Sequence, residues 1–150
     1  MNHPVQVITV AEQLIVAARQ RTTLSRVSAE IQRLLDAPWT FLRKNPDLRR
    51  DGHNVAIYRN DSGEVSVEVG VQVVRPFDPT EAVVCSSTPA GTVATAAHFG
   101  PYSELGDTYR AIQVWCRENR RPLAGVWWEI YGDWSDDPRK LRTDVLYLLA

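Results

Sequence analysis

The stretch Gly125–Trp134 reads GVWWEIYGDW and has an earlier counterpart, GHNVAIYRND, at Gly52–Asp61. Each stretch begins with glycine and reaches an Ile-Tyr pair after the same number of residues. Side chains alternate between the two faces of a β-strand, so the later stretch is expected to carry Trp127, Glu129 and Tyr131 on one face. The recurrence indicates an internal duplication, with one such strand in each copy.

The two halves of the chain are also expected to share one order of elements: strand, helix, strand, strand. The stretch EVSVEVGVQV, Glu64–Val73, alternates valine with polar residues as a strand with one buried face does. Further strands are expected at residues 5–10, 14–19, 54–58, 82–86, 92–99, 125–131 and 141–149. Each half also has apolar residues at helical spacing, which are Leu24, Val27, Ile31, Leu34 and Leu35, and then Leu105, Tyr109, Ile112 and Cys116. We expect Thr22 or Thr23 to cap the first helix and Pro38 to interrupt it.

Hairpins and helices segregated in this way indicate an α+β fold with a mainly antiparallel sheet and two helices. Repeat one is expected at about residues 5–75 and repeat two at about residues 82–149. Each helix is expected to cover one sheet face, with Trp128 packed between the sheet and its helix. The opposite faces, including the face of Glu129, would then form a shared central ligand cleft between the modules.

The composition is that of an ordinary globular protein, with 150 residues, 44% hydrophobic and 23% charged, and a formal net charge of −1. This balance predicts no bulk attraction to nucleic acids or anionic membranes. No apolar run approaches the ~18 residues of a membrane span, and no signal peptide is recognisable, so a cytoplasmic location is expected. The three histidines and two cysteines lack metal-ligand spacing, and no phosphate loop or serine-nucleophile motif occurs. We therefore expect no metal and no cofactor.

The second half resembles the GyrI-like family in four features. These are HFGPY at His98–Tyr102, a helix ending near Trp115, WEIY at Trp128–Tyr131 and a closing strand that begins with RTDV at Arg142–Val145. This gyrase-inhibitor-like, small-molecule-binding domain is also the effector-binding domain of multidrug-sensing bacterial transcription regulators. The motifs cover residues 92–149, and the first half agrees in pattern only. The resemblance implies a duplicated strand-helix-strand-strand fold with a ligand cleft at the junction.

The resemblance also implies a function. Members of the family bind bulky, often cationic or aromatic compounds, and in the regulators the glutamate at the position of Glu129 contacts the positive charge. Sequestration, resistance or regulation would be the biological result. Two alternatives come with the resemblance: hydrolysis of strained cyclopropane-containing compounds by this glutamate with Tyr131 or Tyr102, and an interaction that inhibits or protects DNA gyrase. Residues 1–150 are expected to form one effector-binding domain without a DNA-binding domain, and so without direct contact to nucleic acid.

Glu129 can also be judged from its own neighbourhood. Aromatic rings attract a flat cation by ~0.5–2 kcal/mol per good contact, and a carboxylate adds a charge pair. Ala56 occupies the matching place in the first repeat, so the fold itself does not demand an acid there. The alternative is a solvent-facing Glu129, or one paired with Arg139 or Arg142.

The expected ligand contacts follow from strand alternation and from the ends of the elements. Residues on the Glu129 face of the two Ile-Tyr strands are expected to line the cleft, and residues near its ends are candidates for its walls. If the protein is a hydrolase, the carboxylate and a tyrosine would be acid–base or nucleophilic partners. The expected ligand-binding residues are Glu129, Trp127, Tyr131, Tyr58, Tyr102, Trp39 and Tyr147.

Overall fold

The computed structural model describes residues 4–150, and His3 lies outside them. The strands in this part of the chain are β1 Gln6–Val10, β2 Gln13–Thr22, β3 Asn54–Asp61, β4 Glu64–Gln72, β5 Val84–Thr88, β6 Gly91–Phe99, β7 Leu123–Tyr131 and β8 Arg142–Leu149. The helices are α1 Val27–Leu34, α2 Asp36–Lys44 and α3 Leu105–Glu118, with short 3₁₀ turns η1 Pro46–Leu48, η2 Tyr102–Glu104 and η3 Pro138–Lys140. All strands join one sheet in the order β1-β6-β8-β7-β3-β4-β2-β5, and every neighbouring pair is antiparallel. The predicted α+β fold with a mainly antiparallel sheet is confirmed.

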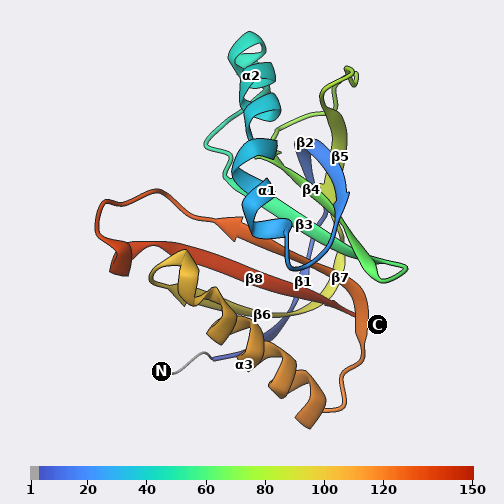
Figure 1. Ribbon diagram of the computed structural model, residues 1–150, viewed down its shortest axis with the longest axis vertical. Helices are drawn as coiled ribbons and strands as arrows, with labels where there is room; N and C mark the ends of the chain where they lie inside the picture. Colours follow the sequence, from blue (N-terminus) through green and yellow to red (C-terminus); the bar gives the residue numbers. More distant parts are fainter. Residues whose placement is uncertain (1–3) are drawn as a thin grey trace.

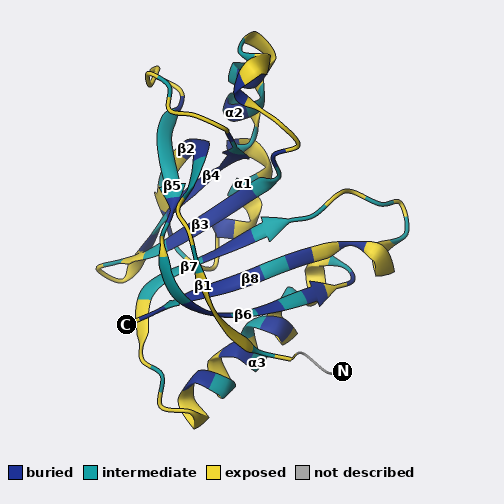
Figure 2. Cartoon of the chain, turned by 180° about the vertical axis from the view of Figure 1, so that it is seen from behind, coloured by how far each residue is buried: buried dark blue, intermediate teal, exposed yellow. Residues whose placement is uncertain are grey.

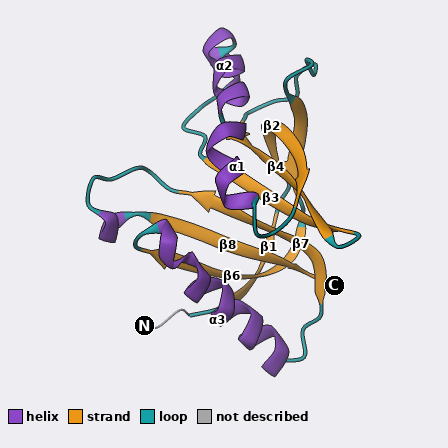
Figure 3. Cartoon of the chain, viewed as in Figure 1, coloured by secondary structure: helices purple, strands orange, loops and turns teal. Residues whose placement is uncertain are grey.

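Figures 1 and 3 show a strongly curled sheet, with α1 and α2 over one half and α3 over the other. The first strand of each half pairs with the second strand of the other half: β1 with β6, and β5 with β2. Val10 lies opposite Gly91 and Gln13 lies opposite Thr88, so the register continues unchanged through both strand breaks. These four strands form one bent ribbon that connects the two ends of the sheet. No local pattern in the sequence predicts this exchange, because it depends on pairing between distant segments.

The first helix differs from its prediction in two details. It consists of two helices that meet at Leu35, rather than one interrupted at Pro38. Pro38 lies in the first turn of α2, where a missing N–H costs no intrahelical hydrogen bond. The predicted cap is wrong, because Thr22 belongs to β2 and the N-cap residue of α1 is Arg26, which makes no side-chain capping bond.

The side of the sheet that the helices cover is opposite to the prediction. Trp128 is 1% exposed and packs among strand residues such as Ile57 and Leu146, without a helix residue in the cluster. Helix α1 instead packs on the face of Tyr58, and α3 packs on the face of Tyr147. The curl and the bent ribbon bring strands from both ends of the sheet together over Trp128. The sheet itself therefore covers the Trp128 face, and helices α1 and α3 lie on the Glu129 face.

Figure 2 shows that buried residues are concentrated in the strands and that exposed ones follow the outer sides of the helices and the loops. None of the helices in residues 4–150 has the length and apolar character needed to cross a membrane.

Candidate functional site

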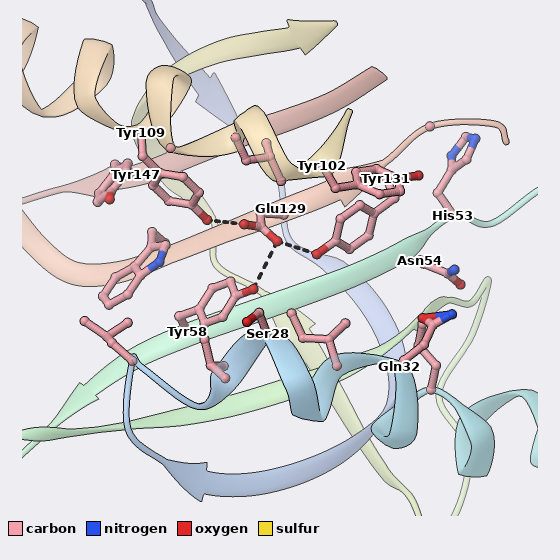
Figure 4. A pocket seen from close by; sticks show the side chains of 18 of the residues that line it. Ser28, Gln32, His53, Asn54, Tyr58, Tyr102, Tyr109, Glu129, Tyr131 and Tyr147 are labelled. Carbon is pink, nitrogen blue, oxygen red and sulfur yellow. Dashed lines mark hydrogen bonds between the residues drawn. The ribbon is translucent and has the colours of Figure 1, made fainter. Parts of the chain in front are cut away.

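A cleft of about 1200 Å³ lies on the Glu129 face of the sheet. Strands β3, β7 and β8 form its floor, and α1 and α3 form its two long walls (Figure 4). Every residue that the sequence predicts as a ligand contact lines this cleft: Glu129, Trp127, Tyr131, Tyr58, Tyr102, Trp39 and Tyr147. The cleft lies between α1 and α3, on the sheet face that these helices cover. The structure therefore brings the predicted contact residues together, although the helices lie on the opposite side of the sheet from the one predicted.

Three aromatic rings form one row across the floor. Tyr58 on β3 lies opposite Trp127 on β7, which lies opposite Tyr147 on β8. The ring centroids are 5.7 and 5.9 Å apart with interplanar angles of 11° and 14°, which is an offset stacked arrangement. The next row consists of Ala56, Glu129 and Val145. Small apolar side chains therefore stand on both sides of the only carboxylate in that row.

Glu129 is 5% exposed, and tyrosine hydroxyls hold its carboxylate. Tyr58 donates to Oε1 at 3.0 Å, Tyr131 also donates to Oε1, and Tyr109 donates to Oε2 (Figure 4). Among residues 4–150 no lysine, arginine or histidine forms an ion pair with it. An ionised carboxylate can only accept hydrogen bonds, and the three phenols donate to it without neutralising its charge.

The alternative predictions for Glu129 are wrong. It is not solvent-facing. Arg139 and Arg142 pair with Asp137 at 3.2 Å and with Asp144 at 2.9 Å instead.

The pKa values of the phenols around Glu129 depend on burial and on its negative charge. Burial, followed by the negative charge of Glu129, raises the pKa of Tyr58, Tyr109 and Tyr131 far above the usual value for tyrosine. These side chains are therefore protonated at neutral pH and act there as hydrogen-bond donors. Burial also raises the pKa of Tyr147.

Tyr109 is the main site residue that the sequence does not identify. It lies on α3, where its spacing with Leu105 and Ile112 predicts an ordinary apolar helix face. Its ring meets the Tyr147 ring edge-on at 5.9 Å and 84°, and Gln113 donates to the Tyr147 hydroxyl at 2.9 Å. A tyrosine among aliphatic residues on that face is a signal for a hydroxyl with a buried partner, but it does not say which partner.

The two aromatic residues at the margins of the cleft differ in their surroundings. Tyr102 is 44% exposed and meets the Tyr131 ring edge-on at 5.7 Å. Trp39 on α2 donates from Nε1 to Oδ1 of Asn54 at 3.0 Å. Among residues 4–150 no group of three histidine, cysteine or acidic side chains is placed to hold a metal ion.

A family model and several solved structures resemble the chain. Residues 3–148 match the model of the GyrI-like small molecule binding domain. The chain belongs to the GyrI-like family. It is therefore a small-molecule-binding domain, and the resemblance inferred from the sequence is confirmed. A search among curated proteins gives no match.

The C-terminal domain of EcmrR has a TM-score of 0.78 at 18% identity, covering 100% of this chain and 99% of that domain. A structure of SAV2435 bound to tetraphenylphosphonium has a TM-score of 0.72 at 9% identity, with coverages of 100% and 94%. A hydrolase encoded by lin2189 from Listeria innocua has a TM-score of 0.61 at 13% identity, with coverages of 97% and 91%. At these identities the three structures establish a shared fold.

Proposed function

We propose that the cleft binds a bulky aromatic cation and that Glu129 supplies the opposite charge. The observation that carries this proposal is a carboxylate, 5% exposed, that accepts only from neutral phenols and faces an aromatic cleft. A buried charge without a counter-ion is costly, and proteins normally pair it. A cationic ligand would complete this pair, because no lysine, arginine or histidine of the described chain pairs with Glu129.

The surroundings of Glu129 favour a flat or bulky cation over a small ion. The parallel rings of Tyr58, Trp127 and Tyr147 present a broad apolar surface beside the carboxylate. Such rings contribute dispersion and roughly 0.5–2 kcal/mol of cation–π attraction for each well-placed contact. SAV2435, which shares the fold, has been solved with tetraphenylphosphonium, an aromatic cation of this kind. The biological result would be sequestration, resistance or regulation through a partner.

Titration with tetraphenylphosphonium, followed by tryptophan fluorescence and calorimetry, tests the proposal. We expect the variant Glu129→Gln to bind at least ~30-fold more weakly, because a desolvated charge pair is lost while shape is kept. Glu68→Gln is the matched control, since Glu68 is also buried but does not line the cleft. Equal affinity of the wild type and Glu129→Gln would contradict the proposal.

A second candidate function is hydrolysis in the same cleft. The observation that favours it is one carboxylate surrounded by three protonated phenols, a set that offers a nucleophile or base together with general acids. The fold is also that of a hydrolase from Listeria innocua. Mass spectrometry of a cyclopropane-bearing electrophile after incubation distinguishes the two functions, because a hydrolase adds the mass of one water and a binding protein returns the compound intact. An interaction with DNA gyrase stays a prediction, which a supercoiling assay with and without the protein would test.

A further inference from the structure

The cleft contains a second charge without an ionic partner. Besides Glu129 and the tyrosines, its ionisable lining residues are Arg49, His53 and Asp133. His53 and Asp133 bind each other, with 3.1 Å between Nε2 and Oδ1. Within residues 4–150 no carboxylate forms an ion pair with Arg49. The cleft therefore offers a buried carboxylate without a cation at its floor and an exposed guanidinium without a carboxylate beside Trp39 of α2.

Arg49 is held in place by neutral groups. Its Nε donates to the backbone oxygen of Gly52 at 3.1 Å, and its guanidinium carbon lies 4.9 Å from the centre of the Trp39 ring. That ring is itself fixed by the hydrogen bond from Nε1 to Asn54. A guanidinium has five N–H donors, and only the Nε donor of Arg49 has a hydrogen-bond partner in the described chain. The remaining donors form a fork of the kind that binds a carboxylate in two-point contact.

Polar side chains line one side of the cleft. Figure 4 shows Gln32, His53 and Asn54 on one side of Glu129, together with the rings of Tyr102 and Tyr131, and Tyr109 and Tyr147 on the other. Amide and imidazole groups can donate hydrogen bonds, so the side of Asn54 offers donors to acceptor groups of a ligand beside the aromatic rings.

The two charges lie in one cleft. Glu129 and Arg49 both line the same space of about 1200 Å³. Arg49 lies over the Trp39 ring, that ring is bonded to Asn54, and Asn54 precedes Ala56, the residue opposite Glu129, by two residues. A space of this volume holds a drug-sized molecule, so both charges can contact one ligand.

We propose that the preferred ligand is zwitterionic: an aromatic compound whose cationic nitrogen lies at Glu129 and whose carboxylate binds Arg49. This inference rests on the proposed function and narrows its ligand class. A purely cationic compound satisfies only one of the two unpaired charges. A compound with both charges satisfies both, and its carboxylate replaces water on a guanidinium that the Gly52 oxygen and the Trp39 ring already orient.

The test compares two dyes of nearly equal shape, rhodamine B, which carries a cation and a carboxylate, and its ethyl ester, which carries only the cation. Affinities are measured by fluorescence anisotropy for the wild type and for Arg49→Gln. We expect the wild type to bind rhodamine B about 5- to 10-fold more tightly than the ester, the range for one partly exposed charge contact. Arg49→Gln should abolish this preference, because it weakens the binding of rhodamine B more than that of the ester.

Two further variants make the result specific. Arg43→Gln is the matched control, because Arg43 is an exposed arginine on α2 that does not line the cleft, and it should keep the preference. Glu129→Gln should weaken the binding of both dyes. Equal or tighter binding of the ester by the wild type, or an unchanged preference in Arg49→Gln, would overturn the zwitterion proposal alone. Unchanged binding of both dyes by Glu129→Gln, or no binding by the wild type, would overturn the proposed function as well.

Discussion

Two glutamates are buried in this sheet, and their partners differ completely. Glu68 on β4 is 1% exposed and binds two arginines, Arg19 and Arg59, each at 2.5 Å, and also accepts from the Ser86 hydroxyl at 2.9 Å. Glu129 on β7 has only phenol donors. Glu68 has a structural role, and the chain neutralises its charge with two arginines, because an unpaired buried charge destabilises the folded state. Glu129 lacks this compensation, which is the physical reason for assigning it to a ligand.

The most severe way to test the comparison is to add a third buried carboxylate without a cation. Ala56 is 0% exposed and lies opposite Glu129. We expect Ala56→Glu to lower the free energy of unfolding by about 3–5 kcal/mol, because two like charges would share one dry row without a counter-ion. Urea denaturation measures this loss. Ala56→Gln adds nearly the same volume without charge, so equal stability of the two variants would show that crowding alone is responsible.

The next test removes the charge of each glutamate in turn and compares the two losses of stability. Glu68→Gln should lower the free energy of unfolding by about 2 kcal/mol, less than for a fully buried pair, because the side chains of Arg19 and Arg59 are 56% and 35% exposed. Glu129→Gln should change stability by less than about 1 kcal/mol, because the amide oxygen still accepts from a phenol while the desolvated charge is removed. Thermal and urea unfolding give both values. A larger loss of stability in Glu129→Gln than in Glu68→Gln would reverse the assignment.

Acid should weaken the contribution of Glu68 to folding stability. Burial by itself would raise the pKa of Glu68, but hydrogen bonds from Arg19, Arg59 and Ser86 and the charge of Arg59 lower it below the ordinary value of 4.5. The folded pKa lies below the unfolded one, so the stabilisation is complete above about pH 4.5 and is lost as pH falls through the folded pKa. The stability difference between the wild type and Glu68→Gln should therefore shrink between pH 6 and pH 3. A difference that is constant over this range would contradict the ion-pair role.

The sequence predicts the strand face of Glu129 but not the surroundings of that face. Alternation places Trp127, Glu129 and Tyr131 together, and this needs only local information. Both faces of β7 carry large aromatic residues, however, so the pattern cannot tell which face a helix covers, and the predicted helix contact of Trp128 is wrong. The pattern does not identify Tyr109 for a related reason, since a tyrosine on an amphipathic helix packs in a core far more often than it binds a carboxylate.

An effect smaller than those of Ala56→Glu and Glu68→Gln is expected from the phenol cage around Glu129, formed by Tyr58, Tyr109 and Tyr131. Tyr109→Phe removes the only donor to Oε2 of Glu129 among residues 4–150 and should cost about 1–2 kcal/mol of folding stability, the range for a hydrogen bond to a charged group. The ring contact with Tyr147 is kept, so packing hardly changes. Tyr102→Phe is the control, because Tyr102 is exposed and contacts the cage only through its ring, and its loss should stay below about 0.5 kcal/mol. A bound cation should reduce the cost of Tyr109→Phe, since it supplies the carboxylate with a new partner. Unfolding with and without tetraphenylphosphonium measures this coupling, and an equal cost in both states would mean that the phenols and the ligand do not share the carboxylate.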